Sequence, residues 1–353
     1  MNCAVVGIGK LGLCFALTIE RTGCHVIGVD INQTYVDSLN AKTYSSYEPG
    51  LTEALRESTR FHATTDLEDA VSKSDYIFIL VQTPETDTSY DHTILEDVIS
   101  KISKMNSVPK HIIVNSTVMP GFHKTQNVGR HTLSYNPAFV AQGTVMSDYA
   151  SGGKFGVIVI GTEDAQVKET LVNLYRSINS DTKINVMTPA SAEIFKIADN
   201  TFRVLKIAYA NLVGDLCRRT PGANQDEVAA ALKNDASIGT ICMTPGYGYG
   251  GPCYPRDLKA LTTYATSVGF RPGLLAGVAT TNEDHHEALL KELLDQNLEA
   301  YVFDSFTYRP DMKVEMFDNS PSLRLALDLH RLGKKITVRD PQSWAYFKEK
   351  ITL

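Results

Sequence analysis

The sequence lacks the features of a membrane protein or a nucleic-acid-binding protein. It has no uninterrupted apolar run near the roughly 18 residues that a membrane-spanning helix requires. It has no basic block, and its formal net charge is −6, so we expect neither a membrane nor a nucleic acid as a partner. The apolar amino terminus has no basic flank and is interrupted by glycines, so we do not expect a signal peptide.

The cysteines show no pattern of a disulfide framework or a zinc site. There are six, and none has the Cys-x-x-Cys spacing typical of such a site. Scattered thiols suit a reducing compartment, so we expect a cytoplasmic protein without a bound metal. The 353 residues exceed what one hydrophobic core usually supports, which predicts two or three domains.

A glycine-rich turn follows the first apolar segment. Residues 2–7 read as a short buried strand, and the sequence GIGKLG at 7–12 leads into a helical apolar pattern. Gly7 permits a tight turn, Gly9 lets the backbone approach a pyrophosphate, and Gly12 lets the helix pack against the strand. The amino terminus of the helix adds N–H groups and a positive dipole end. The pattern predicts a dinucleotide site of the Rossmann type.

The next predicted strands support the same reading. Residues 25–29 end at Asp30, where a carboxylate can accept hydrogen bonds from ribose hydroxyls and would repel a 2′-phosphate, which favours NAD over NADP. Strands at 75–81 and 111–114 lead to loops that contain Thr83, Ser116 and Thr117. Ligands lie at the carboxyl ends of such strands, so these three residues are candidate contacts, although hydroxyls that cap turns would look the same.

Residues 191–219 predict a long helix. Its apolar stripe is formed by Ile194, Ile197, Ala198, Phe202, Leu205 and Leu212. Lys196 falls within the stripe, and Asn200 shares its face because residues four apart are neighbours on a helix. Lysine is seldom buried without a partner or a task, but a lysine that snorkels over apolar surface would give the same pattern. The length of the helix also suggests a dimerisation element.

Four glycines at 246, 248, 250 and 251 lead to Cys253. Such density lets a backbone wrap closely around a ligand. Arg256 and Lys196 could stabilise the Cys253 thiolate, and Asp257 could position or deprotonate water. A thiolate adds to an aldehyde to give a thiohemiacetal, and loss of hydride then gives a thioester that water can hydrolyse. A small cysteine in a turn is the structural alternative.

Six motifs resemble those of the UDP-glucose/GDP-mannose dehydrogenase family, in the same order and spacing. They are GKLG at 9–12, YEPGL at 47–51, NSTVMPG at 115–121, YNP at 135–137, KIADN at 196–200 and GYGYGGPCYPRD at 246–257. The resemblance covers residues 1–345. It implies an α/β protein with an NAD-binding Rossmann domain at 1–185, a helical central and dimerisation domain at 186–290, and an abbreviated α/β domain for the nucleotide sugar at 291–353.

The resemblance also implies a reaction, namely oxidation of C6 of a nucleotide sugar such as UDP-glucose to the uronic acid with two NAD. It implies a homodimer with a role in polysaccharide biosynthesis. Cys253 would be the nucleophile, Lys196 would stabilise the oxyanion, Asn200 would position substrate and water, and Thr117 and Asp257 would help to handle water. The implied NAD contacts are Gly7, Gly9, Lys10, Leu11, Gly12, Asp30, Thr83, Pro84, Ser116, Thr117, Gln142 and Arg256. The implied substrate contacts are Phe139, Lys196, Asn200, Tyr247, Gly248, Tyr249, Gly250, Tyr308 and Arg309.

Several positions depart from the family pattern. Ala138 and Gln142 stand where the family has glutamates, Ser237 and Asp318 stand where it has arginines, and Arg256 replaces a lysine. Losing a general base slows a reaction by about 10²- to 10⁴-fold. Two alternatives therefore stay open: an impaired or non-catalytic homologue that binds NAD and a nucleotide sugar, and a two-electron alcohol dehydrogenase. The second leaves the cysteine loop unexplained.

Overall fold

The computed structural model describes residues 1–105, 108–153, 156–308 and 316–352. The chain forms two compact units, Met1–Lys196 and Ile197–Leu353. The expected division into three domains, at residues 185 and 290, stays a prediction. Among the described residues, none of the helices combines the length and the apolar character needed to span a membrane.

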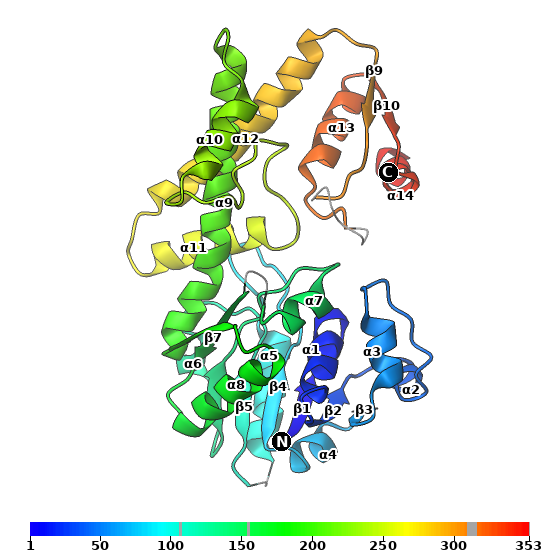
Figure 1. The fold of residues 1–353 in the computed structure, drawn as a ribbon, viewed down its shortest axis with the longest axis vertical. Coiled ribbons are helices and arrows are strands. Elements are labelled where there is room, and N and C mark those ends of the chain that lie inside the picture. Colours follow the sequence, from blue (N-terminus) through cyan, green and yellow to red (C-terminus); the bar gives the residue numbers. More distant parts are fainter. Residues whose placement is uncertain (106–107, 154–155, 309–315, 353) are drawn as a thin grey trace. The chain divides into compact units, whose positions relative to one another are not determined.

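The first unit is built on an eight-stranded sheet in the order β3-β2-β1-β4-β5-β6-β7-β8 (Figure 1). Its strands are β1 (Asn2–Val6), β2 (His25–Val29), β3 (Phe61–Thr64), β4 (Tyr76–Ile79), β5 (His111–Val114), β6 (Thr132–Tyr135), β7 (Val157–Gly161) and β8 (Lys183–Met187). All neighbouring pairs are parallel except β6 and β7, which pair antiparallel at Tyr135 and Gly161. The first six strands follow the Rossmann order, so the α/β expectation is confirmed.

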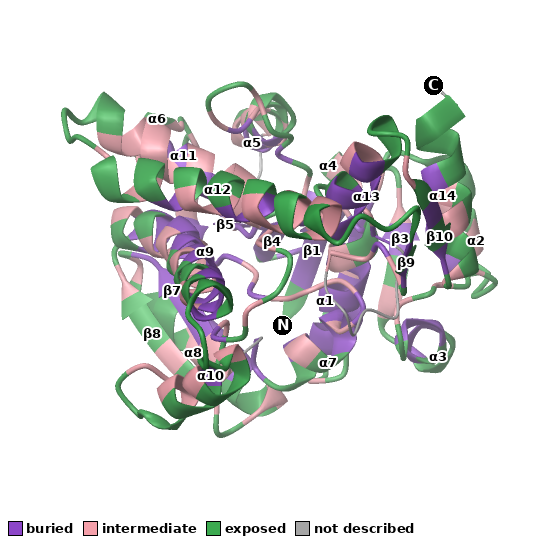
Figure 2. Cartoon of the chain, turned by 90° about the horizontal axis from the view of Figure 1, so that it is seen from above, coloured by how far each residue is buried: buried purple, intermediate pink, exposed green. Residues whose placement is uncertain are grey.

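Helices cover both faces of this sheet. They are α1 (Lys10–Glu20), α2 (Gln33–Asn40), α3 (Leu51–Glu57), α4 (Leu67–Ser72), α5 (Thr93–Lys104), α6 (Phe122–Thr125), α7 (Val145–Ala150) and α8 (Ala165–Ile178). Two hydrophobic clusters result, one built around α1, α7 and α8 and the other around α4 and α5. Helix α1 is buried along nearly its whole length (Figure 2). Complete burial of a side chain such as Phe15 contributes about 1.5–3 kcal/mol, which fixes this helix behind the glycine turn.

The second unit begins within the long helix α9 (Pro189–Arg219) and continues with α10 (Gln225–Asn234), α11 (Tyr254–Ser267) and α12 (Gly273–Asp295). The parallel pair β9 (Ala300–Phe303) and β10 (Lys335–Val338) follows, with α13 (Pro321–Arg331) and α14 (Pro341–Thr352). A compact cluster containing Phe303, Phe306 and Phe347 forms the core of this part. The Pro–Ser start of α13 is capped by the Ser320 hydroxyl, which accepts from the Leu323 N–H.

The long helix is confirmed and starts two residues earlier than expected. Its apolar residues divide between two faces rather than forming one buried stripe. Ile197, Val204 and Ala208 are buried, whereas Phe202 is 61% exposed and Leu212 is 42% exposed. The helical period alone does not say which apolar residues meet a neighbour within the same chain, because the other face of a helix can serve a second chain equally well.

Candidate active site

The glycine turn of the first unit is shaped for close backbone approach. Gly7 has a φ of +88°, and a Cβ there would lie 2.8 Å from the Leu80 carbonyl oxygen. A Cβ at Gly12 would lie 2.0 Å from the Gly7 carbonyl oxygen, whereas a Cβ at Gly9 would meet no heavy atom within 4 Å. Gly9 begins α1 without a side-chain cap. The first N–H groups of α1, those of Lys10 and Leu11 among them, therefore suit a bound pyrophosphate.

Asp30 follows β2 at the same edge of the sheet. Its carboxylate accepts a hydrogen bond from the Asn32 N–H at 3.0 Å, and the Asn32 side chain in turn caps α2. The Tyr35 hydroxyl of α2 donates to the Ile8 carbonyl at 2.8 Å, which ties α2 to the glycine turn. Burial raises the pKa of Tyr35, so the phenol keeps the proton that it donates. These residues fit the ribose and pyrophosphate of NAD.

The loops after β4 and β5 use their polar groups in different ways. Thr83 is buried and Pro84 is exposed. The Ser116 hydroxyl donates to the Val81 carbonyl at 2.6 Å, so this hydroxyl joins the two loops and keeps only its acceptor side for a ligand. Thr117 is half-buried.

Lys196 is held against the segment that carries Ala138. Its ammonium group donates to the Ala138 carbonyl at 2.6 Å and lies 4.5 Å from the centroid of the Phe139 ring. The side chain is buried, and Phe139 packs edge-to-face against Phe195. Lys196 therefore does not snorkel into solvent. Its charge stays at a fixed place at the edge of the first unit's core.

Two buried or half-buried glutamates, neither singled out from the sequence, position these loops. The Glu48 carboxylate accepts the Gly143 N–H at 2.8 Å and the Val145 N–H at 2.6 Å, so the YEPGL motif holds the loop that contains Gln142. The Glu193 carboxylate accepts the N–H groups of Gly121 and His123, at 2.7 and 2.8 Å. Both glutamates lie far along the chain from their partners. Glu48 lies within the YEPGL motif, whereas Glu193 lies in none of the six motifs.

The Gln142 side chain is a further part of this loop. Its Oε1 atom is buried and has no hydrogen-bond partner among the described residues. A buried acceptor that lacks a partner costs free energy, so this atom is suited to a donor supplied by a ligand or by water. The position is compatible with the predicted cofactor contact.

In the second unit, Cys253 lies at the start of α11 and is exposed. The amino terminus of a 14-residue helix favours negative charge, which suits a thiolate. Four residues further on, Asp257 is fully buried, and its N–H donates to the Cys253 carbonyl at 2.8 Å. The Asp257 carboxylate accepts from the Asn200 amide at 2.6 Å and from the Arg256 guanidinium at 3.1 Å. The structure thus joins three predicted site residues through one carboxylate.

The glycine loop before Cys253 packs closely on the carboxyl-terminal segment. A Cβ at Gly250 would lie 2.1 Å from the Asn319 carbonyl oxygen, and one at Gly251 would lie 2.7 Å from the Tyr308 ring. Tyr308 is therefore next to the loop, and its predicted contact with the substrate stays a prediction; Arg309 lies outside the described residues. Tyr247 and Tyr249 line a cavity of about 520 Å³, to which Asp318 also contributes. Gly248 adjoins them in the loop, and Ser237, on another loop, bonds to Asp235.

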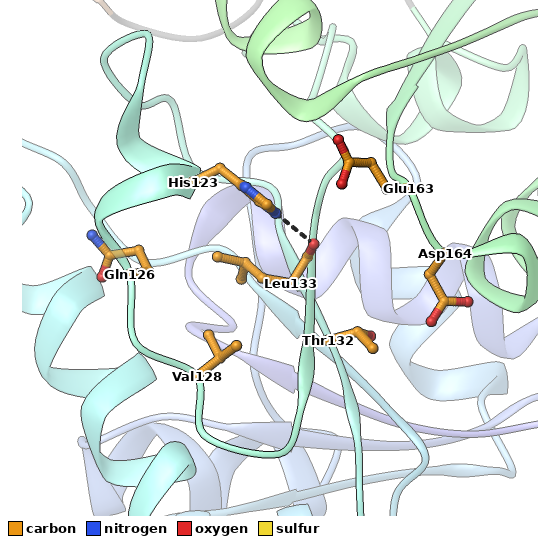
Figure 3. Close-up of a pocket in the computed structure, with 7 residues that line it drawn as sticks. All are labelled: His123, Gln126, Val128, Thr132, Leu133, Glu163 and Asp164. Carbon is orange, nitrogen blue, oxygen red and sulfur yellow. Dashed lines mark hydrogen bonds between the residues drawn. The ribbon is translucent and has the colours of Figure 1, made fainter.

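A separate, smaller cavity of about 340 Å³ lies in the first unit, next to β6 and the residues that follow β7 (Figure 3). It is lined by His123, Gln126, Val128, Thr132, Leu133, Glu163 and Asp164, and the His123 ring contacts the Leu133 carbonyl at 2.8 Å. None of the predicted site residues lines it. Among the described residues, no group of three or more His, Cys, Asp or Glu side chains could hold a metal ion.

The Rossmann sheet, the glycine turn and the acidic end of β2 are typical of a domain that binds NAD. The family model "UDP-glucose/GDP-mannose dehydrogenase family, NAD binding domain" matches residues 1–179, and the model for the central domain of that family matches residues 190–284. The chain belongs to the UDP-glucose/GDP-mannose dehydrogenase family, and it is a nucleotide-sugar dehydrogenase.

Individual relatives agree with this assignment. UDP-glucose 6-dehydrogenase TuaD of Bacillus subtilis is 30% identical over 96% of this chain and 75% of its own length. GDP-mannose 6-dehydrogenase of Pseudomonas aeruginosa is 29% identical over 80% of this chain and 69% of its own length. The solved UDP-glucose dehydrogenase of Pyrobaculum islandicum superimposes with a TM-score of 0.86 and is 27% identical, covering 99% of this chain and 83% of that structure.

Proposed function

We propose that the protein oxidises C6 of a UDP- or GDP-linked hexose to the uronic acid, with UDP-glucose as the first substrate to test. The observation that carries this proposal is the arrangement at α11, where an exposed cysteine adjoins a buried carboxylate that holds Asn200 and Arg256. A two-electron alcohol dehydrogenase would have no use for this arrangement. The names of the relatives TuaD and GDP-mannose 6-dehydrogenase support the substrate class.

On this proposal, Cys253 provides the covalent step. The thiolate adds to the carbonyl carbon of the C6 aldehyde, and the aldehyde oxygen becomes the oxyanion of a thiohemiacetal. The Lys196 ammonium stabilises that oxyanion, because a fixed charge aimed at developing negative charge lowers the barrier. NAD, when bound, supplies the hydride acceptor for both oxidations. Loss of two electrons gives a thioester, and attack by water breaks its C–S bond to release the acid and the thiol.

The water step is where this chain departs from the family pattern. With Ala138 in the motif, no carboxylate stands at that position, and Asp257 is fully buried and bonded to Asn200 and Arg256. We infer that Asp257 orients Asn200 rather than removing a proton from water. Thr117 and Asn200 position the water, and hydrolysis is slow compared with a site that has a glutamate.

The test is to incubate the protein with NAD and a panel of UDP- and GDP-sugars. The number of NADH formed per sugar is counted, and the mass of the intact protein is measured by mass spectrometry. Two NADH and a uronic acid support the full reaction, and an adduct on Cys253 supports a stalled thioester. The variant C253S separates the chemistries: a two-electron dehydrogenase would keep forming NADH, whereas acid formation should be lost here. Absence of product and adduct across the panel would favour the impaired homologue, the second candidate suggested by Ala138.

The proposal extends to a homodimer. Phe202, Tyr209, Leu212 and Leu216 on α9 are all exposed in the single chain. Together with Leu205 they follow a spacing of three and four residues, which is typical of a helix seam that packs against a second helix. A second copy of the chain would cover this seam. A uronic acid attached to a nucleotide suits polysaccharide biosynthesis, and we propose the cytoplasm as its place.

A further inference from the structure

Side chains of α9 and α12 hold the glycine loop at residues 244–251 through hydrogen bonds to its backbone. The Gly246 N–H donates to the Asn211 side-chain oxygen at 2.7 Å, and the Gly246 carbonyl lies 2.7 Å from Nε2 of His285. The Tyr249 N–H donates to the Asn282 side-chain oxygen at 3.0 Å. A glycine-rich segment has more conformational freedom to lose than any other, so these three bonds decide how far the loop is ordered before a ligand arrives.

The His285 contact depends on a second buried residue. Nδ1 of His285 lies 2.9 Å from the Asp215 carboxylate, and both side chains are buried. Nε2 faces a carbonyl oxygen of the loop and Nδ1 faces a carboxylate oxygen of α9, so the ring bridges the loop and the helix. Asp215 also binds Arg218, whose guanidinium contacts Glu292 at 2.9 Å. Asp215 therefore orients the ring that holds Gly246.

Two glycines let the loop approach these helices. A Cβ at Gly214 of α9 would lie 2.8 Å from the Pro245 side chain, and a Cβ at Gly248 would lie 2.7 Å from the Asn282 side-chain oxygen. Gly248 has a φ of +108°, which favours glycine. The loop is therefore seated on α9 and α12 by its shape as well as by hydrogen bonds.

We propose that Asn211, Asp215, Asn282 and His285 are positioning residues that hold the glycine loop ready for the nucleotide sugar. We call these four residues the clamp. The identity of the ligand rests on the proposed function, whereas the contacts by which the clamp holds the loop do not. Asn211 and Asp215 are buried, so they act through the loop and not by touching the substrate. Ordering the loop in advance removes part of the entropy cost of binding, which should appear in the substrate KM more than in kcat.

The test uses D215N, with D164N as the control. Asp164 also faces a histidine, His111, at 3.8 Å, and it lies in the first unit, outside the cavity that Tyr247 and Tyr249 line. We expect D215N to raise the KM for UDP-glucose by about tenfold, on the scale of one hydrogen bond to a charged group, with kcat and the KM for NAD nearly unchanged. D164N should change none of these. Equal effects of D215N and D164N, or a fall in kcat alone, would overturn the clamp.

Hydrogen exchange of the protein without substrate tests the clamp independently of catalysis. D215N and N211L should speed exchange in peptides that contain the Gly246 and Tyr249 amides, and D164N should not. N282A should free the Tyr249 amide, and N282D, which keeps the acceptor, should restore its protection. Unchanged exchange in all loop variants would overturn the clamp whatever the activity. Faster exchange in a protein that turns over no nucleotide sugar would uphold the clamp and refute the proposed function instead.

Discussion

The ammonium group of Lys196 donates to the backbone carbonyl of Ala138 at 2.6 Å. The resemblance to the family implies a glutamate at this position, where the Ala138 side chain packs against the hydrophobic cluster around α1. The lysine charge is met by the carbonyl dipole of the same residue. On the proposed function, the charge that would stabilise an oxyanion is retained, whereas no carboxylate is present at position 138 to activate water.

Restoring the glutamate should speed the water step. We expect A138E to raise the rate of acid formation, by up to the roughly 10²- to 10⁴-fold that a general base contributes, and to shorten the life of any adduct on Cys253. Rapid-quench mass spectrometry measures both. A138Q is the control because it adds the same bulk without a base. Equal rates for the two variants would show that hydrolysis does not limit turnover.

Asp30 should decide the choice of cofactor. We expect D30A to raise the KM for NAD by about tenfold, since the carboxylate can bond to the ribose, and to lessen the preference for NAD over NADP. Steady-state kinetics with both cofactors measures this. Asp37, exposed on α2 and bonded to Gln33 at 2.8 Å, provides a control as D37A. An unchanged KM for NAD in D30A would remove Asp30 from the site.

Glu193 should make stability depend on pH. Burial raises the pKa of its carboxyl above the ordinary value of 4.5, so the folded state binds its proton more tightly than the unfolded state does. The contribution of this group to the free energy of unfolding therefore falls as pH rises through the raised pKa and is recovered as pH falls toward 4.5. Comparing urea unfolding of the wild type and E193Q across this window isolates the contribution of Glu193. If the free energy of unfolding of the wild type rose with pH relative to that of E193Q, the assignment would be contradicted.

The exposed seam of α9 should hold a second copy of the chain. Leu216 is 54% exposed and Leu332, at the end of α13, is 55% exposed. We expect L216E to lower the molar mass measured by light scattering from dimer to monomer, because a charge within an apolar seam loses its water without gaining a partner. L332E should leave the mass unchanged. A monomeric wild type would show that the seam is not a dimer interface.

The sequence predicted the parts of the site that depend on local pattern. The strand, glycine turn and helix at the amino terminus, and the long helix that carries Lys196 and Asn200, are confirmed because neighbouring residues determine them. The short strands β3, β6 and β8 were not predicted, since four or five residues of mixed polarity give a weak period. Glu48, Glu193 and His285 were missed because their partners are 39 or more residues away and meet them only in the folded chain.

The carboxylate of Asp257 shows that a motif does not predict how deeply a residue is buried. The sequence predicted a role toward water for this carboxylate, and the structure places Asp257 in the first turn of α11, after Cys253. Whether a carboxylate reaches solvent depends on what covers it, and here Asn200 and Arg256 take its oxygens. Burial of that kind is a property of the assembled unit and not of the motif.

The close approach of Gly12 to Gly7 limits the substitutions that this gene can accumulate at codon 12. A Cβ at position 12 would meet the carbonyl oxygen of residue 7 at 2.0 Å, and that oxygen belongs to the backbone that every amino acid shares. No second-site change at codon 7 can therefore relieve a substitution at codon 12. In a library of random variants selected only for folded protein, we expect codon 12 to stay glycine even where codon 9, whose Cβ would meet no heavy atom within 4 Å, tolerates alanine.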